Sequence, residues 1–248
     1  MRADQLLVER GLAASRSQAQ RLIAGGARWF DGRAWRPIAK NGDELPAAAQ
    51  VELLDASEAR YVSRGGLKLE GALRAAGIDA SGLRCLDVGQ STGGFTDCLL
   101  RHGAAHVTGV DVGHGQLHES LRGDARVTAI EKVNARELDA ARVGGDFDLV
   151  VGDLSFISLV LVLPALVPLM KPGAALLMLA KPQFELQPSQ LGKGGIVRDA
   201  SLHAVVERKL RDACEQLGLR VQGWYDSAIA GGDGNREFFI HAIRREAS

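Results

Sequence analysis

Two aspartates and a glycine-rich turn mark one stretch of the chain as a binding site for a ligand. Asp87 ends a short apolar run, and Gly89, Gly93 and Gly94 follow it; Asp111 ends the next apolar run, 24 residues after Asp87. Glycine lets the backbone approach a ligand closely. An acid at the tip of a second strand can hold the two hydroxyls of a ribose. The pattern therefore predicts a nucleoside-containing cofactor.

The same turn lacks two common phosphate-binding motifs. Ser91 stands where G-x-G-x-x-G requires its second glycine, and the chain contains no G-x-x-x-x-G-K-[ST] sequence. The turn reads D-x-G-x-x-x-G-G and resembles the first motif of S-adenosylmethionine-dependent methyltransferases, whose cofactor has a ribose but no phosphate. The alternative is a turn that only lets a helix pack on a strand; the two aspartates favour the cofactor.

Four charged residues are expected at the same edge of the predicted sheet. Asp153 follows the apolar segment FDLVVG, Lys181 follows ALLMLA, Glu237 precedes FFIHAI, and Lys68 belongs to a helical segment before the glycine turn. Solvated surface charge is the alternative for each, most readily for Lys68 and Glu237. Asp153 and Lys181 close strongly apolar segments, on the side where ligands bind in such sheets.

These four groups suit methyl transfer to a ribose 2′-hydroxyl, which keeps its proton at neutral pH and needs a base as it attacks. A buried lysine beside a second cation gives up its proton more readily. We therefore predict Lys181 as the general base and Lys68 as its neighbouring cation, with Asp153 and Glu237 orienting both amines. Alignment of oxygen, methyl group and sulfur is expected to supply the larger share of catalysis.

The elements that must position these residues alternate between strands and helices. Strand candidates occupy residues 83–88, 106–110, 127–130, 147–151, 174–180, 220–225 and 238–243. Helix candidates occupy residues 66–76, 95–101, 159–170 and 201–217. This alternation predicts parallel strands joined by right-handed crossovers. The last two strands have no helix between them and predict an antiparallel hairpin. The expected α/β fold resembles the Rossmann-like class I methyltransferases.

Residues 1–60 follow a different pattern and predict a small α+β domain, with residues 61–248 as the methyltransferase domain. Leu6, Leu7, Leu22 and Ile23 recur at helical spacing and predict two short helices. Ser15 and Gln18 form a capping-box pattern before the second helix, and short strands follow it. The first 40 residues hold eight basic and three acidic residues, a net charge of +5. Such a patch is typical of a phosphate-backbone binder; an arginine-rich solvated surface is the alternative.

The segment RADQLLVERGLAASRSQAQRLIAGGARWFDGR resembles the S-four-like RNA-binding domain, in which the second helix and the following turn present basic residues to RNA. Trp29-Phe30 is a departure, since the family more often has smaller β-branched residues there. The resemblance and the charge pattern give the RNA-binding residues as Arg2, Arg16, Arg21, Arg28, Arg33, Arg64 and Lys193.

Nearly the whole chain resembles the TlyA family, the hemolysin-A-like ribosomal RNA 2′-O-methyltransferases. The resemblance rests on YVSRGGLKL (61–69), LDVGQSTGGFTD (86–97), GVDVGHGQL (109–117), VGDLSFISL (151–159), LAKPQFE (179–185), GKGGIVRD (192–199) and GNREFFIHA (234–242). It implies S-adenosylmethionine as the cofactor and ribosomal RNA or ribosomal subunits as the partner. The catalytic tetrad of this family corresponds to Lys68, Asp153, Lys181 and Glu237.

The same resemblance implies a set of cofactor-binding residues. These are Asp87, Gly89, Gln90, Ser91, Thr92, Gly93, Gly94, Phe95, Thr96, Asp111, Val112, Asn134, Asp153 and Leu154. Gln90 is a departure, because the family usually has a small residue there, and it is expected to alter contacts with the methionine part of the cofactor. The glycine-rich segment 192–195 is expected to act as a flap carrying Lys193, with an ordinary surface loop as the alternative.

Composition and residue spacing argue against a disulfide-rich, metal-binding, secreted or membrane-spanning protein. The formal net charge is zero, and the odd count of three cysteines without paired spacing predicts neither a disulfide framework nor a zinc cluster. His114 and His118 have no third ligand nearby, so no metal is expected. The charged segment 1–10 is unlike a secretory signal, and the longest apolar run, residues 159–170, is too short to span a bilayer. We expect a cytoplasmic protein, monomeric or weakly dimeric, that does not bind membranes.

Three alternatives to an RNA methyltransferase stay open at this point. One is a catalytically inactive RNA-binding protein on the same fold, against which Asp153 and Lys181 weigh. Another is a hemolysin-like membrane-active protein, which is disfavoured because the sequence shows no apolar span and no basic amphipathic helix of useful length. The third is a small-molecule methyltransferase, which would leave the basic N-terminal segment without a role.

Overall fold

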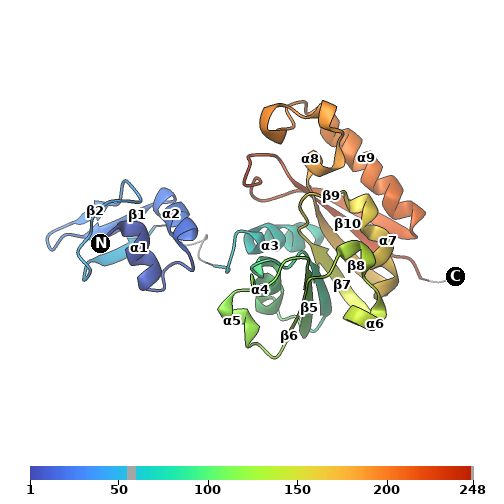
Figure 1. The fold of residues 1–248 in the computed structure, drawn as a ribbon, viewed down its shortest axis with the longest axis horizontal. Helices are drawn as coiled ribbons and strands as arrows, with labels where there is room; N and C mark the ends of the chain where they lie inside the picture. Colours follow the sequence, from blue (N-terminus) through green and yellow to red (C-terminus); the bar gives the residue numbers. More distant parts are fainter. Residues whose placement is uncertain (55–59, 247–248) are drawn as a thin grey trace. The chain divides into compact units, whose positions relative to one another are not determined.

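The structure is a computed structural model and describes residues 1–54 and 60–246. The chain divides into two compact units, Met1–Leu67 and Lys68–Ser248 (Figure 1). Each unit has its own apolar core, and each is described separately below.

The first unit packs two helices against a small antiparallel sheet. Its elements are α1 (Ala3–Glu9), α2 (Arg16–Ala24), β1 (Ala27–Phe30), β2 (Trp35–Pro37) and β3 (Gln50–Leu53), with β1 in the centre of the sheet. Leu6, Leu7 and Leu22 are among the buried residues of its core, as their helical spacing predicted. Ser15 caps α2, since its hydroxyl accepts a hydrogen bond from the Gln18 amide.

The second unit is built on a seven-stranded sheet in the order β6-β5-β4-β7-β8-β10-β9. The strands are β4 (Arg84–Val88), β5 (His106–Asp111), β6 (Val127–Glu131), β7 (Phe147–Gly152), β8 (Met170–Ala180), β9 (Leu219–Asp226) and β10 (Phe238–Arg244). Strands β4 to β8 are parallel, and β10 pairs antiparallel with both β8 and β9. The predicted strands and the terminal hairpin are thus confirmed.

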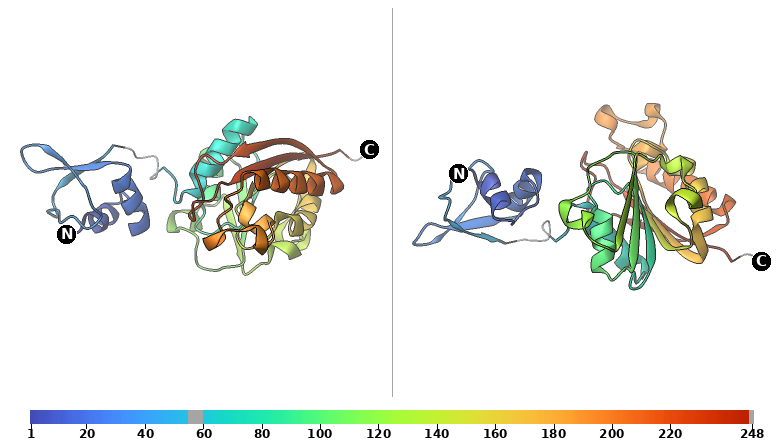
Figure 2. Two further views of the ribbon diagram at one scale, coloured as in Figure 1. Left: turned by 90° about the horizontal axis from the view of Figure 1, so that it is seen from above. Right: turned by 60° about the horizontal axis from the view of Figure 1, so that its bottom comes forward.

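Helices cover both faces of this sheet (Figures 1 and 2). They are α3 (Gly65–Ala76), α4 (Gly94–Arg101), α5 (Glu119–Arg122), α6 (Ala140–Val143), α7 (Leu163–Leu166), α8 (Pro182–Glu185) and α9 (Ser201–Gln216). On one face, α9 buries Val206, Leu210 and Cys214 at helical spacing in the core shared with α7. On the other face, Phe95 of α4 stacks on Phe239 of β10. Because both faces are covered, the parallel strands are almost continuously apolar.

The prediction of one helix over residues 159–170 was wrong. The segment forms a 3₁₀ turn (Leu159–Leu161), the short α7 and a second 3₁₀ turn (Val167–Leu169), and β8 begins at Met170 rather than Ala174. Pro164 and Pro168 explain the difference. Neither has an amide N–H to donate, and a proline ring clashes with the carbonyl four residues earlier in a continuous helix.

The strand order changes direction at β4, with β5 on one side and β7 on the other. In open α/β sheets, ligands bind beyond the carboxyl ends of the strands at such a switch point. The residues that follow β4, β5, β7 and β8 are therefore expected to form a ligand-binding site.

Candidate active site

The loop after β4 packs tightly against the segment after β7, and Gly89 makes this possible. Gly89 has a φ of 85°, in the left-handed region that favours glycine. A Cβ at this position would lie 2.7 Å from the Asp153 carbonyl oxygen. The Asp153 amide also donates a hydrogen bond of 3.1 Å to the Val88 carbonyl oxygen. These contacts fix the ends of β4 and β7 beside each other.

A cavity of about 520 Å³ opens beside this loop. Asp111 lies in its wall at the end of β5 and accepts hydrogen bonds from the Ser91 and Gly113 amides at 2.8 and 2.7 Å. Seven residues predicted to bind the cofactor line this cavity: Gly89, Ser91, Asp111, Val112, Asn134, Asp153 and Leu154. Its volume lies in the range typical of small-molecule and cofactor sites.

Three other members of the predicted cofactor set form a buried hydrogen-bond chain beneath the loop. The Gln90 side-chain amide donates to the Thr96 hydroxyl at 2.9 Å, and this hydroxyl donates to Asp87 Oδ2 at 2.7 Å. Burial raises the pKa of Asp87 to about 7, only partly offset by the hydrogen bond from Thr96. Asp87 is buried beneath the loop and outside the lining of the 520 Å³ cavity, so it supports the loop rather than the cavity wall.

Gln90, the departure from the family pattern, points into this chain and packs over Gly109. A Cβ on Gly109 would come within 2.0 Å of the Gln90 side chain. The larger side chain is thus accommodated in the protein interior, by a glycine on the neighbouring strand, outside the lining of the large cavity.

The remaining predicted cofactor residues begin α4 or precede it. Gly93, with a φ of 93°, is the N-cap of α4, and Gly94 is its first residue. The Thr92 carbonyl oxygen accepts a hydrogen bond from the His118 amide. Phe95 is buried against Phe239 in the core. These four residues support the loop but do not line the 520 Å³ cavity.

The four charged residues meet in one chain of alternating charge. Lys181 Nζ lies 2.6 Å from Asp153 Oδ1, the other Asp153 oxygen lies 4.0 Å from Lys68 Nζ, and Lys68 Nζ lies 2.5 Å from Glu237 Oε2. Lys181 Nζ also donates to the Ser155 hydroxyl at 2.9 Å. The Glu237 side chain is only 3% exposed and that of Lys68 only 10%. A carboxylate thus lies between the two ammonium groups.

The sheet register brings together residues that are far apart in sequence. Because β10 runs antiparallel to β8, with Phe238 opposite Ala180, Glu237 and Lys181 come to the same edge. Pro182 begins α8 directly after Lys181 and holds the lysine in an extended conformation. Gly231 leaves room for Glu237, since a Cβ there would lie 2.7 Å from Glu237 Oε1.

A second cavity, of about 410 Å³, is lined by Lys181, Glu237 and residues of α8. Ser155 and Phe156 line both cavities, and Lys181 and Glu237 line only the second. Sequence reasoning missed Phe156, which is 90% exposed and has a φ of 65°. The signal for Phe156 in the sequence was its position three residues after Asp153. The charged chain therefore lies between a cavity suited to a cofactor and a cavity open to another substrate.

The relatives of the chain identify its family. The family model described as FtsJ-like methyltransferase matches residues 61–244, and the model of the S4 domain matches residues 1–27. A "16S/23S rRNA (cytidine-2′-O)-methyltransferase TlyA" of Mycobacterium tuberculosis is 46% identical over 96% of this chain and 88% of its own length. The chain belongs to the TlyA family. It is therefore an enzyme of the FtsJ-like methyltransferase class, as predicted.

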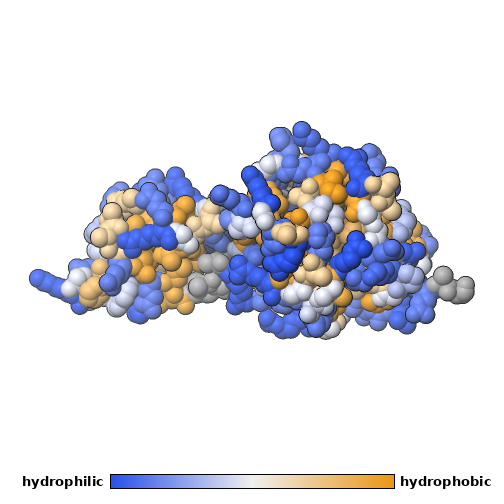
Figure 3. All heavy atoms as spheres, turned by 90° about the horizontal axis from the view of Figure 1, so that it is seen from below, coloured by the Kyte–Doolittle hydropathy of each residue, from blue (hydrophilic) through white to orange (hydrophobic). Residues whose placement is uncertain are grey.

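Other TlyA-family relatives carry a different name. "Hemolysin A" of Brachyspira hyodysenteriae is 36% identical over 98% of this chain and 100% of its own length. A solved structure from Streptococcus thermophilus, also named as a hemolysin, covers 100% of this chain and 89% of its own with a TM-score of 0.76 and 38% identity. Among the described residues of this TlyA-family chain, no helix is long and apolar enough to cross a membrane. Figure 3 shows hydrophilic residues interspersed with apolar ones on the drawn face of each unit.

Two arginines of the S4 domain are held by a buried acid. Asp4 is fully buried, and its Oδ2 lies 3.0 Å from both the Arg2 and the Arg16 guanidinium. The Arg2 hydrogen bond, together with Arg16 and Gln20, outweighs burial and holds the pKa of Asp4 well below its usual range. Arg2 and Arg16 therefore stabilise this domain, whatever else they bind.

The other predicted RNA-binding residues lie in varied surroundings. Arg28 pairs with Glu52 at 2.7 Å, and residues 41–54 add three acids and no base, which lowers the net charge of residues 1–54 to +2. Arg21 is in the last turn of α2, Arg33 in the β1–β2 turn, and Arg64 just before α3. Lys193 begins a 3₁₀ turn in which Gly194 and Gly195 have positive φ.

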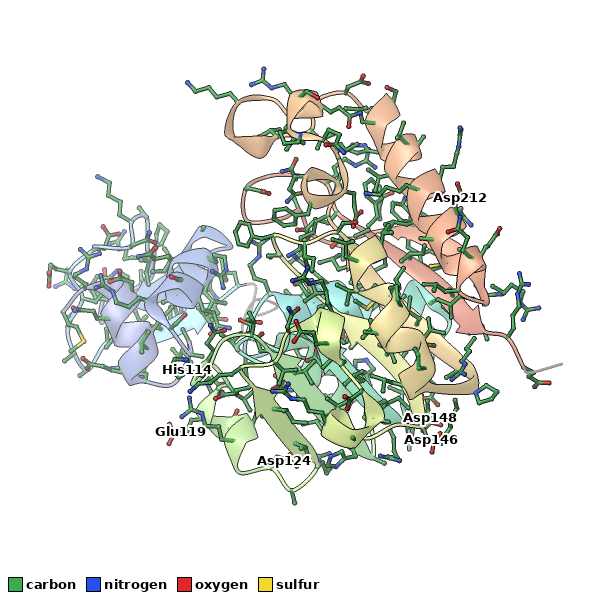
Figure 4. All side chains as sticks on the ribbon, turned by 45° about the vertical axis from the view of Figure 1, so that its right-hand side comes forward. His114, Glu119, Asp124, Asp146, Asp148 and Asp212 are labelled. Carbon is green, nitrogen blue, oxygen red and sulfur yellow. The ribbon has the colours of Figure 1, made fainter. Side chains whose placement is uncertain are left out.

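The remaining candidates give no second site. Among the residues that the structure describes, no group of three or more His, Cys, Asp or Glu side chains could hold a metal ion. Figure 4 shows Asp124, Asp146 and Asp148 at the edge where the parallel strands begin, and Asp212 on the outer side of α9. Cys85, Cys98 and Cys214 are buried free thiols.

Proposed function

We propose that this enzyme transfers the methyl group of S-adenosylmethionine to a ribose 2′-hydroxyl of ribosomal RNA. One observation carries the proposal: the Lys181–Asp153–Lys68–Glu237 chain lies at the junction of the two cavities. The names of the M. tuberculosis relative and of the S4 domain support RNA as the substrate.

The first cavity fits the cofactor by its chemistry. Asp111 lies in the wall, and its two carboxylate oxygens, each of which already accepts one backbone amide, have lone pairs left for the two hydroxyls of a ribose. Gly89 keeps the backbone clear of a side chain where the ligand must pass, and Asp87 supports the loop from below through Thr96. When bound, S-adenosylmethionine supplies a methyl group activated by a positively charged sulfur.

The residues of the second cavity would act on the acceptor ribose. Lys181, in its neutral form, takes the 2′-hydroxyl proton on Nζ while the oxygen forms a bond to the methyl carbon. Bound S-adenosylmethionine would supply the methyl carbon and a sulfur leaving group that retains the electron pair of the broken carbon–sulfur bond. Asp153 then stabilises the ammonium group that Lys181 has become, from 2.6 Å. Glu237 holds Lys68, and Lys68 in turn lies 4.0 Å from Asp153, so one cation faces both carboxylates of this buried site.

Two measurements test the proposal. Calorimetry should show binding of S-adenosylmethionine and of its demethylated product, and none of NAD. Ribosomal RNA incubated with the protein and labelled S-adenosylmethionine should gain a 2′-O-methyl group at a defined nucleotide. Binding of NAD alone, or methyl transfer only to small molecules, would overturn it.

Replacement of the ribose-binding acid gives a sharper test of the first cavity. Asp111→Ala should weaken S-adenosylmethionine binding by about 1–3 kcal/mol, because two hydroxyls lose their acceptors. Asp212→Ala on the exposed side of α9 is the matched control and should bind like the wild type. Equal affinities of the two variants in calorimetry would show that Asp111 does not hold the cofactor.

A further inference from the structure

The second cavity continues beyond Lys181 along the start of α8. Gln183, Phe184 and Asp233 line this part, together with Phe156. Gln183 and Lys181 line the same cavity, so a nucleotide whose ribose reaches Lys181 can place its base against Gln183. The volume of about 410 Å³ is ample for a single nucleotide base.

The orientation of the Gln183 amide is fixed by its neighbour. Gln183 Nε2 donates to Asp233 Oδ2 at 3.0 Å. Asp233 also accepts hydrogen bonds from the Asn235 backbone and side-chain amides, each at 3.0 Å. Burial raises the pKa of Asp233, but the Asn235 and Gln183 amides outweigh burial and keep this pKa below its usual range. An ionised carboxylate only accepts hydrogen bonds, so the NH₂ group of Gln183 must face it.

The other end of the amide is therefore an acceptor. Gln183 Oε1 is buried and receives no hydrogen bond from the described residues. A buried acceptor without a donor is unfavourable, and a ligand that brings a donor relieves the deficit. A substrate that brings a second acceptor makes it worse.

We propose that Gln183 determines which base the enzyme accepts, by taking a hydrogen bond from an exocyclic amino group. Cytosine carries such a donor at N4 and adenine at N6, whereas uracil has an acceptor oxygen at the position of the cytosine amino group. The inference rests on the proposed function, because it assigns the base of the nucleotide whose ribose is methylated.

The test uses ribosomal RNA in which the methylated nucleotide has been mapped and then replaced through ligation of a synthetic fragment. The replacements at this position are cytidine, adenosine, uridine and 2-pyrimidinone ribonucleoside, which is cytidine without its amino group. For the wild type, kcat/KM should fall roughly ten- to a hundredfold when the amino group of cytidine is removed, and at least as far with uridine. The adenosine arm shows which amino-bearing base fits.

The decisive comparison is between the wild type and Gln183→Leu. The variant should lose activity on cytidine yet show the same kcat/KM for cytidine and 2-pyrimidinone, since the acceptor that distinguishes them is gone. Gln183→Met serves as a second variant of similar length, and Gln222→Leu, an exposed residue of β9, is the matched control that should keep full discrimination. A ratio between substrates is unaffected by a general loss of folded enzyme.

Two outcomes would overturn the inference. Equal wild-type activity on cytidine, uridine and 2-pyrimidinone would show that no amino group is recognised. Undiminished discrimination by both Gln183 variants would place recognition elsewhere. If the wild type methylates no RNA at all, the proposed function fails instead, so the two failures are distinguishable.

Discussion

Strand β8 has a lysine at each end. Each lysine pairs with an aspartate in the neighbouring strand β7 or directly after it. Lys171 Nζ lies 2.6 Å from Asp148 Oδ1, and Lys181 Nζ lies 2.6 Å from Asp153 Oδ1. The lysines differ in burial, because the Lys171 side chain is 43% exposed and the Lys181 side chain 11%, whereas the Asp148 and Asp153 side chains are similar at 25% and 23%. The first pair lies where the parallel strands begin, and the second lies between two cavities.

An ion pair gains a chemical role from its environment. An exposed pair is screened by water and contributes little even to stability. The buried pair is linked through Asp153 to Lys68 and Glu237 and has space for substrates on both sides. The fully buried Asp4 is a third case, because its two partners are arginines, which cannot give up a proton.

The largest effect should come from the same substitution at the two ends of β7. Asp153→Asn removes the carboxylate that stabilises protonated Lys181, so the rate at saturating cofactor and RNA should fall about 10²–10⁴-fold. Asp148→Asn should leave this rate within about twofold, because its pair is exposed and distant. A similar loss in both variants, measured by methyl incorporation, would mean that the two pairs do not differ as described.

A smaller effect is expected when arginines of the S4 domain are removed. Replacing Arg16 and Arg21 with Ala should weaken RNA binding and reduce the salt slope by about 0.7–0.9 for each lost phosphate contact. Filter binding over a range of salt concentrations measures this. Since Arg16 also pairs with Asp4, a thermal unfolding curve must accompany it. An unchanged slope in a folded variant would mean that these arginines are only a solvated surface.

The smallest effect concerns the stability of the first unit. The lowered pKa of Asp4 stabilises this unit above the ordinary aspartate pKa of about 4, and this stabilisation is lost as the pH falls below it. Asp4→Asn should therefore speed amide exchange in α1 and α2 at pH 6, with a smaller difference from the wild type at pH 3. Glu52→Gln breaks an exposed pair in the same unit and should change little. A difference that does not shrink in acid would show that the Asp4 charge is not what matters.

The sequence predicted the elements around the site better than the contacts within it. The turn at Gly89 and the acids at the strand ends follow from strand spacing and from where polar residues end apolar runs. The broken segment at Pro164 and Pro168 was predictable from proline chemistry, but the apolar run concealed it. Gln90 turns inward because Gly109 leaves room on another strand, and no local pattern records that.

The contacts between distant residues depend on register. Lys68 and Glu237 are 169 residues apart and meet only because β10 inserts antiparallel between β8 and β9. Their pairing was expected from the family resemblance, since spacing in the sequence does not determine it. The exposure of Phe156 likewise reflects the backbone after β7, which residue type alone does not reveal.

The role of Lys181 as a base is best measured through the same conservative change at the two ends of β8. Methyl transfer by Lys181→Arg and Lys171→Arg should be followed across a pH range at saturating cofactor and RNA. We expect Lys171→Arg to match the wild type and Lys181→Arg to be inactive at every pH, because a guanidinium keeps its proton. Turnover by Lys181→Arg close to that of the wild type would show that this residue only positions the ribose, and would contradict its assignment as the base.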